Sequence, residues 1–215
     1  MDIDVHRRPK FIVVTGGPGA GKTAVLEVVR RHFCEHVAVL PEAAGIVFGG
    51  GFPRTSTDAG RRAAQRAIFH VQRELECMFD EQGQAEIVLC DRGTLDGVAY
   101  WPGNVSDFFH DVGTSLEAEL GRYAMVIHLR TPPADGGYNH KNPLRIESAS
   151  DAARIDARIG DIWSNHPRRI VVENSTRFFD KLHRVLELLR AEMPACCHTQ
   201  PPALAPNLVR ESVMQ

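Results

Sequence analysis

The chain has 215 residues, of which 43% are hydrophobic and 24% charged, and its formal net charge is −2. This composition is ordinary for a globular protein with one α/β domain, and the charge gives no support for wholesale binding to nucleic acid or to an anionic membrane. The five cysteines form no C-x-x-C pair and the start of the chain lacks the apolar core of a signal peptide, so we expect a reduced, cytoplasmic setting. No apolar run approaches the roughly 20 residues of a membrane-spanning helix.

The first predicted element is a buried strand over Lys10–Thr15, after an N-terminal extension of residues 1–9. The stretch Gly16–Thr23 follows and fits G-x-x-x-x-G-K-S/T at every fixed position. Glycines let backbone N–H groups close around phosphates, and the next helix adds the positive end of its dipole. Binding of ATP or GTP with Mg²⁺ is therefore predicted for Gly16, Gly17, Pro18, Gly19, Ala20, Gly21, Lys22 and Thr23. Lys22 would reach the β- and γ-phosphates, and the Thr23 hydroxyl would bind Mg²⁺.

A helix is predicted over Thr23–Phe33, and a second strand over Val37–Leu40 ends shortly before Glu42. The segment Gly45–Pro53 is rich in glycine and is expected to be a mobile loop. Apolar residues then recur at helical spacing over Ser56–Glu81. The arginines on this helix either form a solvated surface or direct one or two cations toward a substrate anion; they are Arg61, Arg62, Arg66 and Arg73.

The third predicted strand, Glu86–Cys90, runs into Asp91 and Arg92. A carboxylate at the end of an apolar strand suits metal binding, and the following arginine suits a cation on a transferring phosphoryl group. A hydrolytic motor of the AAA type usually has glutamate in place of this arginine. The alternatives are a turn or helix cap for Asp91 and a salt bridge within the loop for Arg92.

The rest of the chain continues the alternation of helices and strands. The predicted elements are a helix near Thr94–Tyr100, a short helix over Leu116–Leu120, a strand over Met125–Leu129, a helix over Ala152–Trp163, a strand over Ile170–Val172 and a closing helix over Phe178–Met193. A polar lid region is expected at about residues 131–150. The domain is predicted to cover residues 10–193, and residues 194–215 form a proline-rich tail of weak order.

Five strands in alternation with helices predict an α/β chain with the three-layer P-loop NTPase fold and a mostly parallel five-stranded sheet. Ligands in such sheets bind at the carboxyl ends of the strands. The glycine-rich loop, Glu42, Asp91 and Arg130 all follow strands, so we expect them at one edge of the sheet.

Four segments together resemble the NadR/Ttd14 type of AAA domain: Gly16–Thr23, Pro41–Ala44, Ala67–Glu76 and Cys90–Tyr100. This group includes the ribosylnicotinamide kinase part of a bacterial NAD regulator and an animal protein that binds GTP and phosphoinositides. The resemblance extends over residues 11–189. The chain also has a broader likeness to deoxynucleoside and nucleotide kinases. It implies a phosphotransferase core.

The resemblance also implies roles for individual residues. Glu42 would take a proton from the acceptor hydroxyl, and Asp91 would hold Mg²⁺ directly or through water. Arg145 would be a lid arginine that closes over the phosphates. The alternatives are a solvated or N-cap carboxylate for Glu42 and a surface ion pair for Arg145. Asp96 and Tyr100 either line the acceptor pocket or serve packing and capping.

The leading hypothesis is a Mg²⁺-dependent kinase that transfers phosphate from ATP or GTP to a small hydroxylated metabolite such as a nucleoside. Its predicted catalytic residues are Lys22, Glu42, Asp91, Arg92 and Arg145, and its predicted metal ligands are Thr23 and Asp91. One alternative is a regulatory module that binds nucleotide, hydrolyses it slowly and has a lipid or protein partner. Another is a polynucleotide-kinase-like activity. A lipid or nucleic acid partner would require a basic surface, for which only the arginines of residues 60–73 are candidates.

Overall fold

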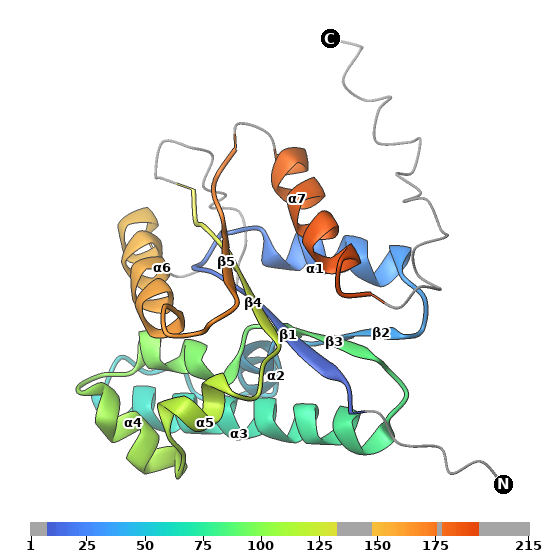
Figure 1. Ribbon diagram of the computed structural model, residues 1–215. Coiled ribbons are helices and arrows are strands. Elements are labelled where there is room, and N and C mark those ends of the chain that lie inside the picture. The colour runs from blue at the N-terminus through green and yellow to red at the C-terminus, as the bar shows by residue number, and fades with distance from the viewer. Residues whose placement is uncertain (1–7, 133–147, 176–177, 194–215) are drawn as a thin grey trace, which may run out of the picture.

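The computed structural model describes residues 8–132, 148–175 and 178–193. In these ranges the chain forms one sheet covered by helices on both faces (Figure 1). Its strands are β1 (Lys10–Thr15), β2 (Val37–Leu40), β3 (Ile87–Asp91), β4 (Met125–Leu129) and β5 (Arg169–Val172). Their order is β2-β3-β1-β4-β5, and every neighbouring pair is parallel. The predicted α/β P-loop fold is therefore confirmed, with a sheet that is parallel throughout.

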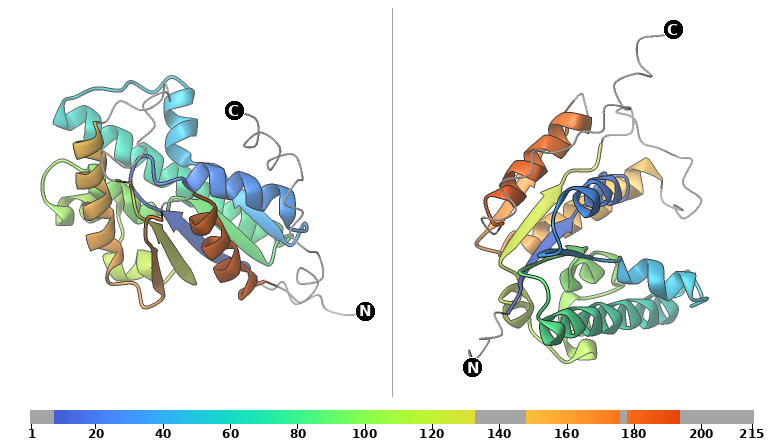
Figure 2. Two further views of the ribbon diagram at one scale, coloured as in Figure 1. Left: turned by 90° about the horizontal axis from the view of Figure 1, so that it is seen from above. Right: turned by 90° about the vertical axis from the view of Figure 1, so that its right-hand side faces the viewer.

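The helices divide between the two faces of the sheet (Figures 1 and 2). One face carries α1 (Lys22–His32) and α7 (Phe178–Arg190). The other is covered by α3 (Asp58–Gln82), the 3₁₀ helix η1 (Thr94–Tyr100), α4 (Val105–Val112), α5 (Leu116–Leu120) and α6 (Ala149–Trp163). The short helix α2 (Ala43–Gly49) packs against α3. In the described residues no helix has the length and apolar character needed to cross a membrane.

The central strand β1 builds both halves of the core. Ile12 and Val14 pack toward α1 and α7, whereas Val13 packs toward the helices of the other face. All three side chains are fully buried. Successive side chains of a strand point to opposite faces, and both faces of β1 are covered by helices. Its sequence is therefore a continuous apolar run.

The prediction of a mobile loop over Gly45–Pro53 is wrong for Gly45–Gly49, because residues 43–49 form α2. Its first residue, Ala43, is buried, and the helix packs on α3. This tertiary contact offsets the low helix propensity of glycine. The helix ends at Gly50, whose N–H donates to the carbonyl of Ile46 over 2.8 Å, and Gly51 continues with a positive φ of 92°.

Candidate active site

The loop Gly16–Thr23 connects β1 to α1 at the carboxyl edge of the sheet. Gly16, Gly19 and Gly21 have φ values of 140°, 82° and 94°, a region that side chains with a Cβ rarely adopt. A Cβ at Gly16 would lie 2.1 Å from the carbonyl oxygen of Leu129. The loop is therefore a tight backbone turn directly before a helix N-terminus, which is an arrangement suited to phosphate.

Lys22 is buried at the first position of α1. Its Nζ donates to the carbonyl oxygens of Gly16 at 2.8 Å and Gly17 at 3.1 Å. Burial, reinforced by the guanidinium of Arg92, lowers the pKa of Lys22 to about 8. Its ammonium group is thus held inside the loop where a phosphate would bind.

Asp91 is the last residue of β3 and is only 8% exposed. Burial raises the pKa of its carboxyl to about 6, although the Lys22 ammonium opposes the rise. Its Oδ1 atom is buried and has no hydrogen-bond partner among the described residues. A buried carboxylate oxygen without a partner is suited to bind a cation or a metal-bound water. Thr23 lies exposed one residue after Lys22.

The donor set around this site fits Mg²⁺ better than a metal held by protein ligands alone. In the described ranges, no three His, Cys, Asp or Glu side chains are grouped to hold a metal ion. Mg²⁺ is usually bound by one or two protein oxygens together with water and phosphates. Asp91 and Thr23 are oxygen donors of that kind.

Arg92 connects three parts of the site. Its Nε donates to Glu42 Oε1 over 2.6 Å, and its Nη1 donates to Asp96 Oδ2 over 3.2 Å and to the carbonyl oxygen of Gly16 over 3.3 Å. Its guanidinium lies 5.8 Å from the centroid of the Tyr100 ring. Arg92 is also the one non-glycine residue in the described ranges with a positive φ, 73°. A strained backbone at a charged cluster often accompanies function.

Glu42 lies between β2 and α2, and its side chain is 38% exposed. Although burial acts to raise its pKa, the Arg92 guanidinium and its hydrogen bond lower it below the usual value. The carboxylate is therefore ionised at neutral pH. It makes no capping hydrogen bond to α2, so the N-cap alternative does not explain its side-chain position.

Asp96 is buried behind Arg92 and does not line an open pocket. It accepts hydrogen bonds from Thr15 Oγ1 at 2.6 Å, Trp163 Nε1 at 2.7 Å and Arg92. Of the two alternatives for Asp96, the structure therefore favours packing. Tyr100 is half-buried beside the Arg92 guanidinium.

Two charged side chains form hydrogen bonds to the backbone of the phosphate loop, and neither was predicted from the sequence. Asp156 of α6 accepts from the Gly17 N–H over 2.9 Å. Lys181 of α7 donates to the carbonyl oxygens of Ala20 at 3.3 Å and Arg130 at 2.8 Å. Each is therefore a link from a different helix to the loop.

The sequence contains a signal for both residues, namely a charged residue next to the apolar positions of a helix. Asp156 lies among the buried positions Ala152, Ile155 and Ile159 of α6, and Lys181 directly precedes the buried Leu182 of α7. A charge on the apolar stripe of a helix is rarely buried without a partner. Such a charge therefore indicates a specific internal contact.

Of the two arginines Arg130 and Arg145, the structure describes only the first. Arg130 follows β4, and its Nη1 lies 3.0 Å from Asp156 Oδ2, so it belongs to the edge that carries the phosphate loop. Arg145 lies outside the described residues, as do 133–147 of the predicted lid region and the tail 194–215.

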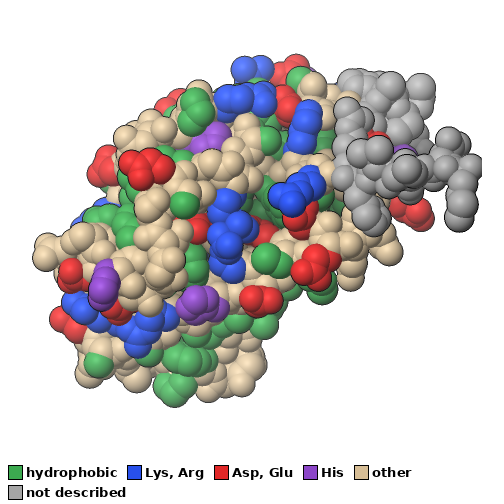
Figure 3. All heavy atoms as spheres, turned by 60° about the horizontal axis from the view of Figure 1, so that its bottom comes forward, with side chains coloured by type: hydrophobic (Ala, Val, Ile, Leu, Met, Phe, Trp, Pro, Cys, Tyr) green, Lys and Arg blue, Asp and Glu red, His purple; other side chains and the backbone are tan. Residues whose placement is uncertain are grey.

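The arginines of α3 are engaged with acidic side chains. The pairs are Arg61 with Asp58 at 3.3 Å, Arg62 with Asp107 at 3.5 Å, Arg66 with Asp111 at 2.8 Å and Arg73 with Glu119 at 3.1 Å. Figure 3 shows basic and acidic side chains interspersed on the face turned toward the viewer. These contacts favour the first alternative for the four arginines, a solvated helix surface, over a role in binding a substrate anion.

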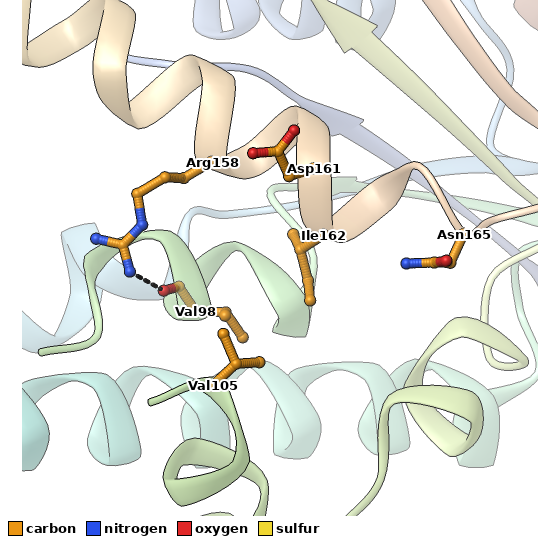
Figure 4. Close-up of a pocket in the computed structure, with 6 residues that line it drawn as sticks. All are labelled: Val98, Val105, Arg158, Asp161, Ile162 and Asn165. Carbon is orange, nitrogen blue, oxygen red and sulfur yellow. Dashed lines mark hydrogen bonds between the residues drawn. The ribbon is translucent and has the colours of Figure 1, made fainter. Parts of the chain in front are cut away.

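A hollow of about 250 Å³ lies between η1, the start of α4 and the end of α6 (Figure 4). It is lined by Val98, Val105, Arg158, Asp161, Ile162 and Asn165. Arg158 Nη2 donates to the carbonyl oxygens of Val98 and Trp101, each over 3.1 Å, and thereby joins α6 to η1. None of the residues predicted for the active site lines this hollow.

Comparison with known proteins places the chain among P-loop proteins. No match was found among curated proteins. The structure of thymidylate kinase from Candida albicans is similar, with a TM-score of 0.62 and 14% sequence identity over 86% of this chain and 92% of that chain. At this identity the likeness concerns the fold. A family model described as an AAA domain matches residues 11–181, and the chain therefore belongs to that AAA domain family.

Proposed function

We propose that the chain is a Mg²⁺-dependent kinase that transfers the γ-phosphoryl group of ATP or GTP to a hydroxyl of a small metabolite such as a nucleoside. The observation that carries the proposal is the contact set of Arg92. This side chain joins Glu42, a candidate base, to the Gly16 carbonyl of the phosphate loop. A candidate base and a phosphate site held together by one guanidinium suit in-line phosphoryl transfer, which depends on positioning and on stabilisation of charge.

In this reaction Glu42 accepts the proton of the acceptor hydroxyl while that oxygen bonds to the γ-phosphorus. The bond from phosphorus to the bridging oxygen breaks, and the nucleoside diphosphate leaves with the electron pair. The low pKa of Glu42 keeps it ionised and able to accept the proton at neutral pH. Lys22, Arg92 and the loop N–H groups stabilise the negative charge of the transferring group. Bound Mg²⁺, held by Thr23 and Asp91, would neutralise charge on the β- and γ-phosphates.

An aromatic side chain beside the phosphate loop is suited to a nucleotide base. Phe178, the first residue of α7, is 43% exposed. Its ring packs on Gly21, where an added Cβ would lie 2.9 Å from Phe178 Cε2. An aromatic ring beside the phosphate loop offers a stacking surface that adenine and guanine both fit.

The similarity to a solved kinase structure and the sequence resemblance support the same activity. The four sequence segments resemble the NadR/Ttd14 type of AAA domain, which includes a ribosylnicotinamide kinase. Arg145 is part of the proposal through that resemblance, as a lid arginine over the phosphates. The cytoplasmic setting expected from the sequence is also part of the proposal, because it would supply ATP and GTP for this reaction.

The test is phosphoryl transfer from ATP and GTP to nucleosides, ribosylated vitamins, inositides and oligonucleotides with a 5′-hydroxyl, followed by mass spectrometry. We expect one acceptor class to gain 80 Da in the presence of Mg²⁺, the mass of an added phosphoryl group. Glu42→Gln should lower kcat by roughly 100-fold or more and retain nucleotide binding. Glu81→Gln, at an exposed position near the end of α3, is the matched control and should keep full activity.

Two results would contradict the proposal. Tight nucleotide binding without any phosphorylated acceptor would favour the regulatory module. Unchanged nucleotide affinity in Lys22→Ala would overturn the assignment of the phosphate loop itself.

A further inference from the structure

Asp96 lies where three separate parts of the fold meet. Thr15 comes from the end of β1, Trp163 from the end of α6, and Arg92 from the turn after β3. The Asp96 Oδ2 atom accepts from Thr15 Oγ1 at 2.6 Å and from Arg92 Nη1 at 3.2 Å, whereas Oδ1 accepts from Trp163 Nε1 at 2.7 Å. The carboxylate is thus satisfied on both oxygens and is held in one orientation.

Arg92 depends on that orientation. Its guanidinium is held between the carboxylates of Asp96 and Glu42. The guanidinium group is planar and its N–H bonds point in fixed directions, so an anchor on Nη1 also sets the direction of Nε. Nε is the atom that holds Glu42 at 2.6 Å. The position of Asp96 therefore determines where the Glu42 carboxylate points.

We propose that Asp96 is a positioning residue that holds Arg92 and, through it, aims Glu42 at the acceptor hydroxyl. Its catalytic consequence rests on the proposed kinase function, whereas its effect on Arg92 does not. Asp96 itself touches neither substrate, because its carboxylate is buried behind the guanidinium.

The substitution Asp96→Asn separates positioning from packing. The amide has nearly the shape of the carboxylate, but its NH₂ group is a donor and faces the donor of either Arg92 or Trp163, depending on the orientation of the amide. In both orientations the negative charge beside the guanidinium is lost. The variant therefore weakens the contact to Arg92 while it fills the same space.

The first measurement needs no catalytic activity. In ¹⁵N-labelled protein, the Nε–H signal of Arg92 is assigned by its loss in Arg92→Lys, and its exchange with water is measured. We expect slow exchange in the wild type, because Nε is hydrogen-bonded to Glu42, and at least roughly tenfold faster exchange in Asp96→Asn. An unchanged signal would overturn the proposal.

The second measurement is kinetic, with the acceptor found in the transfer assay. Misplacement of a catalytic group by about 1 Å can cost 100-fold in rate, so Asp96→Asn should lower kcat by roughly 10- to 100-fold with the KM for ATP within about threefold. In an Arg92→Met background the same substitution should have little further effect, because the route through Arg92 is already lost. Full additivity of the two substitutions would overturn the proposal.

Two further variants keep the test decisive. Trp163→Phe removes the donor to Asp96 Oδ1 together with part of a buried ring, and it should shift both readouts in the same direction by a smaller amount. It replaces Asp96→Asn if that variant does not fold. Val185→Ala in the core of α7 is the control for general loss of stability and should leave the Arg92 signal unchanged. If no acceptor is phosphorylated while the Arg92 signal responds, the kinase proposal fails and the positioning of Arg92 stands.

Discussion

At the scale of single residues, Asp91 is a carboxyl group whose ionisation opposes folding. Its carboxyl is 8% exposed, and burial raises its pKa from 3.8 to about 6. Between these two values the folded state binds a proton that the unfolded state has released. The free energy of unfolding therefore falls as the pH rises through this window. The proposed role of Asp91 in binding Mg²⁺ would account for the presence of this unfavourable charge.

Asp91→Asn should remove that dependence on pH. The quantity to compare is the free energy of unfolding of the variant minus that of the wild type. We expect this difference to increase by roughly 2–3 kcal/mol from pH 4 to pH 7, since one pKa unit corresponds to about 1.4 kcal/mol. Urea denaturation at both pH values measures the difference. Asp58→Asn is the control, because the Asp58 side chain is exposed. A difference between variant and wild type that is the same at both pH values would contradict the prediction.

At the scale of elements, α6 and α7 hold the phosphate loop from opposite faces of the sheet. Asp156 binds the Gly17 N–H and Lys181 binds the Ala20 carbonyl. Lys181 is buried, and burial lowers its pKa. The helices thus fix the shape of the loop, and we expect nucleotide binding to depend on that shape.

Lys181→Met should weaken nucleotide binding more than it weakens the fold. Loss of the donor to Ala20 frees the loop, whereas removal of a buried charge offsets the lost hydrogen bonds. We expect ATP affinity to fall about tenfold, which is 1.4 kcal/mol, with a smaller change in the free energy of unfolding. Calorimetric titration and urea denaturation measure the two quantities.

Arg184→Met is the control for Lys181→Met, because Arg184 lies on the exposed side of the same helix and pairs with Glu187. Equal ATP affinity in the two variants would show that the Ala20 carbonyl needs no support from α7.

At the scale of the whole molecule, the site joins three strands of the sheet that are far apart in the sequence. β1 supplies the phosphate loop, the region between β2 and α2 supplies Glu42, and β3 supplies Asp91. A ligand that contacts all of them binds only the folded chain, so it should stabilise the molecule as a unit.

Mg²⁺ and ATP at about 100 times the dissociation constant should add about 2.7 kcal/mol to the free energy of unfolding. For a domain of this size the melting temperature should then rise by roughly 5–10 °C. Differential scanning fluorimetry measures the rise, which we expect to shrink when EDTA removes the metal and to vanish in Lys22→Ala. A full rise in the presence of EDTA would contradict the role of Mg²⁺.

The elements that were predicted correctly are those with strong local patterns. β1, β2 and β4 have the predicted bounds, because short β-branched runs bounded by turn residues define a buried strand locally. The helix α2 was missed because its stability comes from packing on α3, against the propensity of its glycines.

The sequence by itself determined the fold class, the phosphate loop and the residues at strand ends, because each depends on neighbours in the chain. Lys22 could be chosen from the glycine-rich motif, and Glu42, Asp91 and Arg92 could be chosen because parallel strands end at one edge. Only the tertiary structure decided which side chains hold them. Asp96 meets Thr15 across 81 residues, and Asp156 and Lys181 reach the phosphate loop across 139 and 161 residues. No local pattern encodes such contacts, because they form only when the sheet has brought distant segments together.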